Sequence, residues 1–161
     1  MTVQTGRTVK KCMDFILHDS GGVLRSIAID SINGIGVVYE EEDMTAFQDS
    51  LKNVLSGHGD APIDITGPFD NLVVAAVGTL SGSHTVLSAL NGVTTPLSVD
   101  VRLGVRHAWE AGEPQFGITA TTTNGYIVTS YTVNPGTSKY AASLRMMGGS
   151  EAPAWGIAAE S

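Results

Sequence analysis

The sequence predicts a mainly β protein, a β-sandwich or barrel of antiparallel strands with one short α-helix at its flank. Three observations predict this fold class. Residues 97–106 alternate between apolar and polar side chains, which is the pattern of a strand with one buried face. Residues 116–123 and 126–133 are rich in β-branched and aromatic residues. The Asn124-Gly125 pair between them is typical of a β-hairpin turn.

Four antiparallel strands are therefore expected in the second half of the chain. The first covers residues 97–106, and its apolar face consists of Leu97, Val99, Val101, Leu103 and Val105. The two strands around Asn124-Gly125 come next. The Asn-Pro-Gly turn at 134–136 then leads into a fourth strand at 139–147.

The first half is less regular. Residues 13–18 and 23–29 are expected to form strands around a turn at 19–22, and residues 34–39 a third strand. One helix is predicted over about 83–91. Ser83 would be its N-cap, and Gly92 lies just beyond its expected end.

The remaining segments complete a single domain of 161 residues. Residues 1–12 form a polar N-terminal arm, 40–62 an acidic loop and 148–161 a C-terminal tail. Within the acidic loop, residues 44–55 fit either a helix or an irregular segment.

The composition favours a subunit of an assembly over a nucleic-acid reader. Only 16% of residues are charged, so much of the surface is neutral, as on a protein covered by other subunits. The net charge of -7 and the nine basic residues leave too few cations to neutralise DNA phosphates. Residues 30–70 hold nine acidic residues and a single basic one, Lys52, whereas the first 25 residues are basic. This asymmetry suits self-association, and a solvated acidic loop is the alternative.

Cysteine and hydropathy patterns indicate the compartment. Cys12 is the only cysteine, so the fold cannot depend on an internal disulfide. The longest apolar run, residues 72–77, is far shorter than the ~20 residues of a membrane helix. No secretion signal is recognisable in the first fifteen residues, so we expect synthesis in a reducing cytoplasm and no membrane partner.

Catalytic motifs are not apparent, and neither an enzyme activity nor a cofactor is expected. His58 and Asp60 have the spacing of two ligands in a two-histidine, one-carboxylate metal site, with His84 or His107 as a third. Any histidine two residues from an aspartate has this spacing, so a surface turn is the preferred interpretation. Nucleophile-elbow, dinucleotide-binding and phosphate-loop motifs do not occur.

Five motifs occur in order along the chain. They are a hairpin at 15–27 with Leu24-Arg25 after a small-residue turn, Thr-Ala-Phe-Gln-Asp at 45–49, Phe-Asp within 65–71, paired strands at 128–133 and 140–144, and Ala-Pro-Ala-Trp-Gly at 152–156. In this order they resemble the major tail tube protein of long-tailed, siphovirus-type bacteriophages. Residues 1–11 match no part of that family, and residues 72–80 are more apolar than its corresponding loop.

The resemblance implies a structural virion protein. Six copies would form a ring, and stacked rings would form a hollow tail tube through which DNA reaches the host. It implies contacts with the protein itself, with the tape measure protein and with tail-end proteins. Double-stranded DNA would pass without specific binding. The protein would lie in the virion tail, and in the host cytoplasm during assembly. The alternatives are a capsid decoration protein and a small β-barrel metal-dependent enzyme.

Two sets of residues are candidates for function in such a tube. The subunit-contact candidates are Glu40, Glu41, Glu42, Asp43, Phe47 and Trp155. The candidates for charges at the lumen or at an interface are Asp100, Arg102 and Arg106. We expect a lumen of net negative charge, because it would repel DNA phosphates and let the duplex slide.

Overall fold

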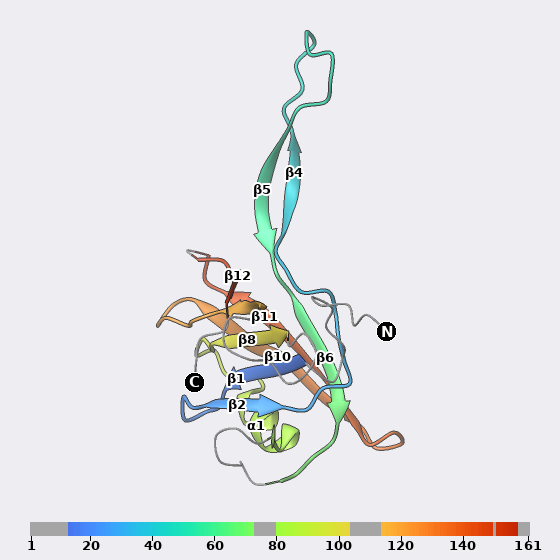
Figure 1. The fold of residues 1–161 in the computed structure, drawn as a ribbon, viewed down its shortest axis with the longest axis vertical. Helices are drawn as coiled ribbons and strands as arrows, with labels where there is room; N and C mark the ends of the chain where they lie inside the picture. The colour runs from blue at the N-terminus through green and yellow to red at the C-terminus, as the bar shows by residue number, and fades with distance from the viewer. Residues whose placement is uncertain (1–12, 73–79, 104–113, 150, 158–161) are drawn as a thin grey trace, which may run out of the picture.

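The computed structural model describes residues 13–72, 80–103, 114–149 and 151–157. Two sheets pack face to face, and a third, two-stranded sheet projects from them (Figure 1). The six-stranded sheet has the order β12 (Ala154–Ile157), β9 (Pro114–Ile118), β8 (Val99–Leu103), β1 (Met13–His18), β2 (Leu24–Ile27) and β7 (Leu80–Ser81). The four-stranded sheet has the order β10 (Gly125–Asn134), β11 (Lys139–Met147), β6 (Ile63–Pro68) and β3 (Ser31–Ile32). The projecting sheet consists of β4 (Val38–Asp43) and β5 (Val54–Asp60).

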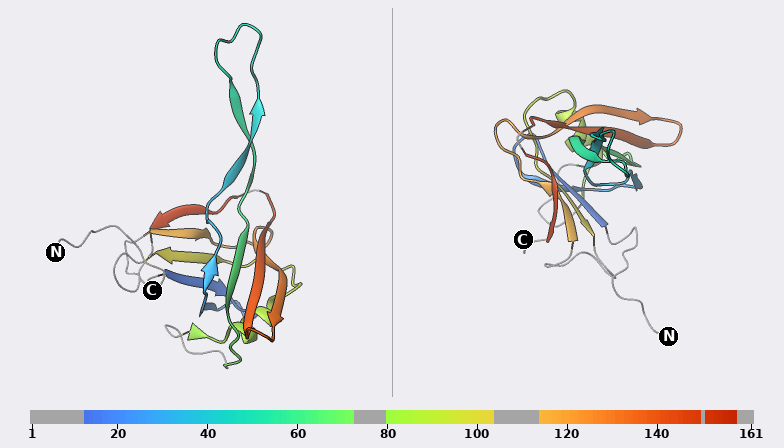
Figure 2. Two further views of the ribbon diagram at one scale, coloured as in Figure 1. Left: turned by 90° about the vertical axis from the view of Figure 1, so that its right-hand side faces the viewer. Right: turned by 90° about the horizontal axis from the view of Figure 1, so that it is seen from above.

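The core lies between the two larger sheets and is closed by α1 (Ser83–Leu90). The six-stranded sheet contributes Phe15, Leu17, Ile27, Val99, Val101 and Ile118. The four-stranded sheet contributes Ile63, Ile65, Tyr126, Val128, Tyr140, Ala142 and Leu144. Within the described ranges, the strand pairs are antiparallel except for β2 with β7. The predicted fold class is confirmed, and among the described residues it is an open sandwich (Figure 2).

The predicted helix is present, but its N-cap is Gly82 and not Ser83. The Ser83 hydroxyl turns away from the helix and donates a hydrogen bond to the Pro68 carbonyl at 2.9 Å. A glycine is needed at the cap, because a Cβ atom on Gly82 would lie 2.3 Å from the Leu72 carbonyl oxygen. At the other end Gly92 has a φ of +80°, as expected for a residue just beyond a helix.

The predicted hairpin at Asn124-Gly125 is wrong. Strand β9 pairs with β8 and β12, whereas β10 pairs with β11, so the chain crosses between sheets at this point. Asn124 is fully buried, and its side-chain amide donates to the Glu151 carbonyl at 3.2 Å. Asn124 and Gly125 therefore form a closely packed connection between the two sheets. The turn after β10 forms as predicted and joins β10 to β11.

In the first half, β1 has the predicted bounds, and β2 lies within its predicted range. Their turn is held by Asp19, whose carboxylate accepts hydrogen bonds from the Gly21 and Val23 amides. The predicted third strand lies a few residues later, as β4. Part of the predicted C-terminal tail is a strand, β12, at the edge of the six-stranded sheet. The N-terminal arm lies outside the described residues.

Candidate assembly surface

The segment expected to be an acidic loop, residues 40–62, instead belongs largely to a projecting two-stranded ribbon (Figures 1 and 2). We call β4, the tip loop 44–53 and β5 together the hairpin arm. All residues of β4 are exposed, and so is nearly all of β5. The four consecutive acids tolerate this conformation because alternation along a strand places Glu40 and Glu42 on one face and Glu41 and Asp43 on the other.

Two glycines of β5 accommodate the side chains of β4. A Cβ atom on Gly59 would lie 2.7 Å from the Tyr39 ring, and one on Gly57 would lie 3.0 Å from the Glu42 carboxylate. These glycines belong to the segment expected to be an acidic loop. Here the glycines leave room for cross-strand packing, and a bulge between Tyr39 and Glu41 shifts the register.

The tip loop is held by local hydrogen bonds. The Met44 amide donates to the Asn53 carbonyl at 2.9 Å, which closes the loop across its base. The Ala46 amide donates to the Asp49 carboxylate at 2.8 Å, and the Asp49 amide donates back to the Ala46 carbonyl. Hydrogen bonds from Thr45 lower the pKa of Asp43 at the start of the loop. The tip therefore has a defined shape that presents Phe47 outward.

The root of the arm is fixed to the sandwich. The buried Tyr126 hydroxyl donates to the Ala61 carbonyl at 2.8 Å, and burial raises the pKa of this tyrosine. Asn33 precedes β4, and its side chain binds the segment that follows β5, donating to the Pro62 carbonyl and accepting from the Asp64 amide, each at 3.0 Å. The arm is thus an extension of the folded body.

The arm carries most of the uncovered apolar side chains. Among the described residues, thirteen large hydrophobic side chains are exposed, and seven of them lie on the arm: Val38, Tyr39, Met44, Phe47, Leu51, Val54 and Leu55. Phe47 is fully exposed and Leu51 is 82% exposed. Such a concentration of apolar surface is typical of an interaction site.

The structure gathers five of the six subunit-contact candidates on this arm: Glu40, Glu41, Glu42 and Asp43 on β4 and Phe47 in the tip loop. Trp155 lies on β12, with its ring centroid 5.2 Å from that of Phe116 and its indole nitrogen near Gly36 at the root of the arm. The other exposed apolar residues of the tip loop, Met44 and Leu51, were missed. The sequence did contain a signal for them, because these apolar residues interrupt an acidic segment.

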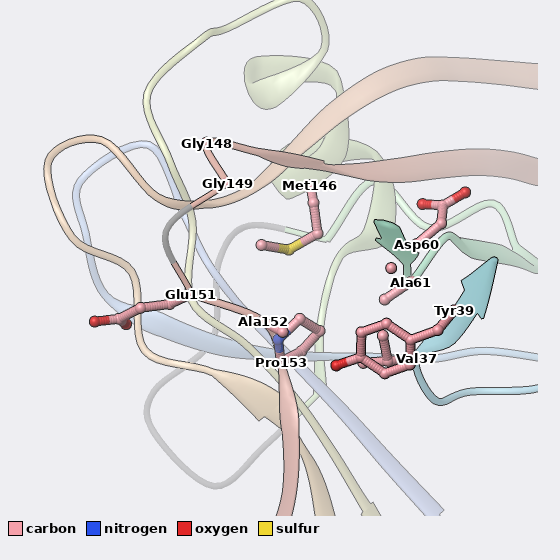
Figure 3. Close-up of a pocket in the computed structure, with 11 residues that line it drawn as sticks. Val37, Tyr39, Asp60, Ala61, Met146, Gly148, Gly149, Glu151, Ala152 and Pro153 are labelled. Atoms are coloured by element: carbon pink, nitrogen blue, oxygen red, sulfur yellow. The ribbon is translucent and has the colours of Figure 1, made fainter. Parts of the chain in front are cut away.

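A pocket of about 270 Å³ lies at the root of the arm (Figure 3). Its apolar walls come from Val37, Tyr39, Met146 and Pro153. The carboxylates of Asp60 and Glu151 lie on opposite sides of it (Figure 3). We call this the root pocket. Nothing in the sequence pattern indicated it, because it joins segments about 90 residues apart.

The charge candidates Asp100 and Arg102 lie on the outer face of the six-stranded sheet, where Arg102 is in register with Asp14 and Gln115. Arg106 lies outside the described residues. Burial raises the pKa of Asp100, although the charges of Arg102 and His18 counteract it. Gly117 on β9 makes room for this carboxylate.

Replacing Asp100 by asparagine is expected to increase the free energy of unfolding at pH 7, by less than about 1 kcal/mol at this partly exposed site. The native pKa is raised, so the charged form is disfavoured in the folded state above that pKa. The gain should disappear as the pH falls below the pKa of the unfolded chain, and urea titrations at pH 7 and pH 3 would measure it.

Asp64→Asn is the matched control with the opposite sign. A hydrogen bond from Arg145 at 2.9 Å lowers the pKa of Asp64, so its charged form stabilises the fold. This variant should lose stability at neutral pH and match the parent in acid. Destabilisation of Asp100→Asn at pH 7 would show that its partners outweigh its burial.

The possible metal ligands do not converge in the described structure. His58 and Asp60 lie on β5, whereas His84 lies on α1 and its imidazole bonds the Tyr131 hydroxyl at 2.9 Å. No group of three potential ligands that could hold a metal ion occurs in residues 13–72, 80–103, 114–149 and 151–157, and His107 falls outside these ranges. The helix of the described chain is too short to cross a membrane.

Solved structures with a similar fold come from a prophage baseplate and from an extracellular contractile injection system. The chain is similar to one in the cryo-EM structure of the anti-feeding prophage baseplate, with a TM-score of 0.60, 10% identity and coverage of 96% of this chain and 97% of that one. It is also similar to a chain in the sheath-tube complex of an extracellular contractile injection system (PVC), with a TM-score of 0.52, 12% identity and coverage of 89% and 88%. A third similarity is to the PVC sheath/tube terminator, with a TM-score of 0.50, 11% identity and coverage of 97% of both chains. No family model and no curated protein sequence matches. The chain shares its fold with components of contractile injection systems.

Proposed function

We propose that this chain is the tube subunit of a phage tail or tail-like injection machine. It would assemble into stacked hexameric rings around a hollow channel through which DNA is delivered. The observation that carries the proposal is the hairpin arm, a folded extension with seven uncovered apolar side chains. Covering an exposed apolar surface of this extent with another subunit is favourable, because it removes the apolar side chains from water.

The arm also favours a particular kind of assembly. A single arm that contacts a different surface of the next copy makes a head-to-tail interface, and such interfaces generate rings or filaments. The similar baseplate structure was solved with six-fold symmetry, and two other similar chains belong to tube and sheath assemblies. These likenesses support six copies in a ring, as the resemblance to tail tube proteins implies.

Open sheet edges offer the lateral contacts within a ring. On the side of β10 away from β11, the described residues form one bridge, between Tyr126 and Leu97, and one further hydrogen bond, from the Gly92 amide to the Val128 carbonyl. Strand β12 is the outer strand of the other sheet. Exposed edges promote pairing with other chains, and a closed ring of subunits would cover them.

The proposed partners, the location and the passage of DNA follow from the assembly into a tube. The partners would be the protein itself, the tape measure protein and the tail-end proteins, with neither a catalytic role nor a cofactor. The location would be the virion tail, and the host cytoplasm during assembly. DNA would slide past a lumen of net negative charge, with Asp100, Arg102 and Arg106 at the lumen or at a subunit interface.

Sedimentation velocity over a range of protein concentrations tests the proposal. We expect a six-subunit species and larger multiples of it as the concentration rises. Discrete trimers, or a monomer that binds only to capsids, would favour a capsid decoration protein and overturn the tube assignment.

A further inference from the structure

The tip of the hairpin arm combines an apolar side chain with a cation. Phe47 is fully exposed, and the hydrogen bonds between Ala46 and Asp49 hold the loop on either side of it. Lys52, five residues further on, is the only basic residue between Asp30 and Asp70 and forms no ion pair with any described residue. The tip therefore presents the aromatic ring of Phe47 and the positive charge of Lys52.

The root pocket has the complementary chemistry. Its volume of about 270 Å³ is ample for an aromatic ring, since a protein cavity of ~150 Å³ binds benzene. The Tyr39 ring and the Met146 thioether supply apolar and polarisable contacts of the kind that aromatic side chains favour. Asp60 and Glu151 line the pocket on opposite sides and form no ion pair with described residues (Figure 3).

Two other pockets of the described structure fit the Lys52 side chain less well. The pocket beside Ile29 and Ile32 contains Asp30, which already pairs with Lys139 at 2.8 Å. The pocket beside Leu90 contains Asp19, which already binds Arg25 at 3.0 Å and two backbone amides.

The tip cannot reach the root pocket of its own chain. Strand β5 runs from Val54 at the tip to Asp60 at the pocket, and six extended residues span about 20 Å. Any occupancy of the pocket by a tip therefore involves a second copy. We propose that the root pocket receives the hairpin tip of another subunit, with Phe47 inside it and Lys52 beside Asp60. This inference rests on the proposed self-assembly.

A charge exchange between separate chains tests this contact. Lys52→Glu and Asp60→Lys should each weaken self-association at least about tenfold, because each places like charges together. Mixing the two variants should restore assembly, since each tip then meets a pocket of opposite charge. Lys139→Glu reverses an exposed lysine that lies outside the pocket and pairs with Asp30. It is the control: it should not restore assembly when it is mixed with Asp60→Lys.

A photo-crosslinking residue in place of Gln48, beside Phe47, gives an independent readout. In assembled particles, the crosslinked peptide of the neighbour should contain residues 146–153. Crosslinks to the basic segment 1–12 or to the turn at 19–22, or assembly that survives both single reversals, would overturn the pocket assignment while leaving the tube intact. A wild-type protein that stays monomeric would instead overturn the proposed function, and this contact with it.

Discussion

Replacing Phe47 and Leu51 together by serine is expected to abolish self-association. Both side chains are exposed in the single subunit, so their removal costs the folded monomer little. In an assembly, burying each apolar side chain contributes about 1.5–3 kcal/mol, so the double variant should weaken each contact by a factor of about 100 or more. Sedimentation velocity measures the association, and thermal unfolding of the dilute monomer should be unchanged.

Two other exposed apolar residues provide the control for this variant. Leu24 and Val93 lie on the sandwich, outside the arm, and are 41% and 40% exposed. Their replacement by serine also removes exposed apolar surface from the monomer, although less of it, because Phe47 and Leu51 are more exposed. If these variants lose assembly as completely as the tip variant does, general surface hydrophobicity and not the arm drives association.

Replacing Gly117 by alanine is expected to have the largest effect on stability, a loss of about 1–3 kcal/mol or failure to fold. A Cβ atom there would lie 2.0 Å from the Val99 carbonyl oxygen and 2.5 Å from the Asp100 carboxylate. The backbone of β8 cannot yield at that distance without breaking its pairing with β9. Urea unfolding followed by circular dichroism measures the change.

Gly156→Ala is the matched control, because Gly156 lies on the neighbouring strand β12 and a Cβ atom there meets nothing within 4 Å. This variant should change stability by less than about 0.5 kcal/mol. Equal losses in both variants would mean that alanine is disfavoured in these strands for reasons other than close packing.

Local patterns were enough to predict the elements whose pairing partner is near in sequence. Strand β1, the turn at Asp19 and the connection of β10 to β11 follow from alternation and turn residues. The helix and its end before Gly92 were predicted, although its N-cap was not. Gly82 is required by a contact with Leu72, which no local pattern reveals.

Long-range pairing decided the elements that sequence patterns misassigned. Asn124 and Gly125 match a hairpin signal, yet strand β9 is held by β8 and β12, so the chain must cross to the other sheet. The acidic run resembled a solvated loop because its charges hide the strand pattern. Its partner β5 contributes glycines whose packing role appears only once β4 lies beside them.

The candidate site was predicted in part. The acidic run and Phe47 were identified as contact residues, and the structure places them on one projecting arm. The root pocket could not be predicted, because it combines Tyr39 and Asp60 of the arm with Met146 and Pro153 of the C-terminal region. Only the folded arrangement of the sheets brings these segments together.

Electron microscopy of the concentrated purified protein tests the central claim most directly. We expect hollow tubes of stacked rings whose end views have six-fold symmetry, with the arm of each subunit buried against another copy. Solid particles, separate trimers or a field of monomers at high concentration would contradict the account, even though the sandwich fold would stand.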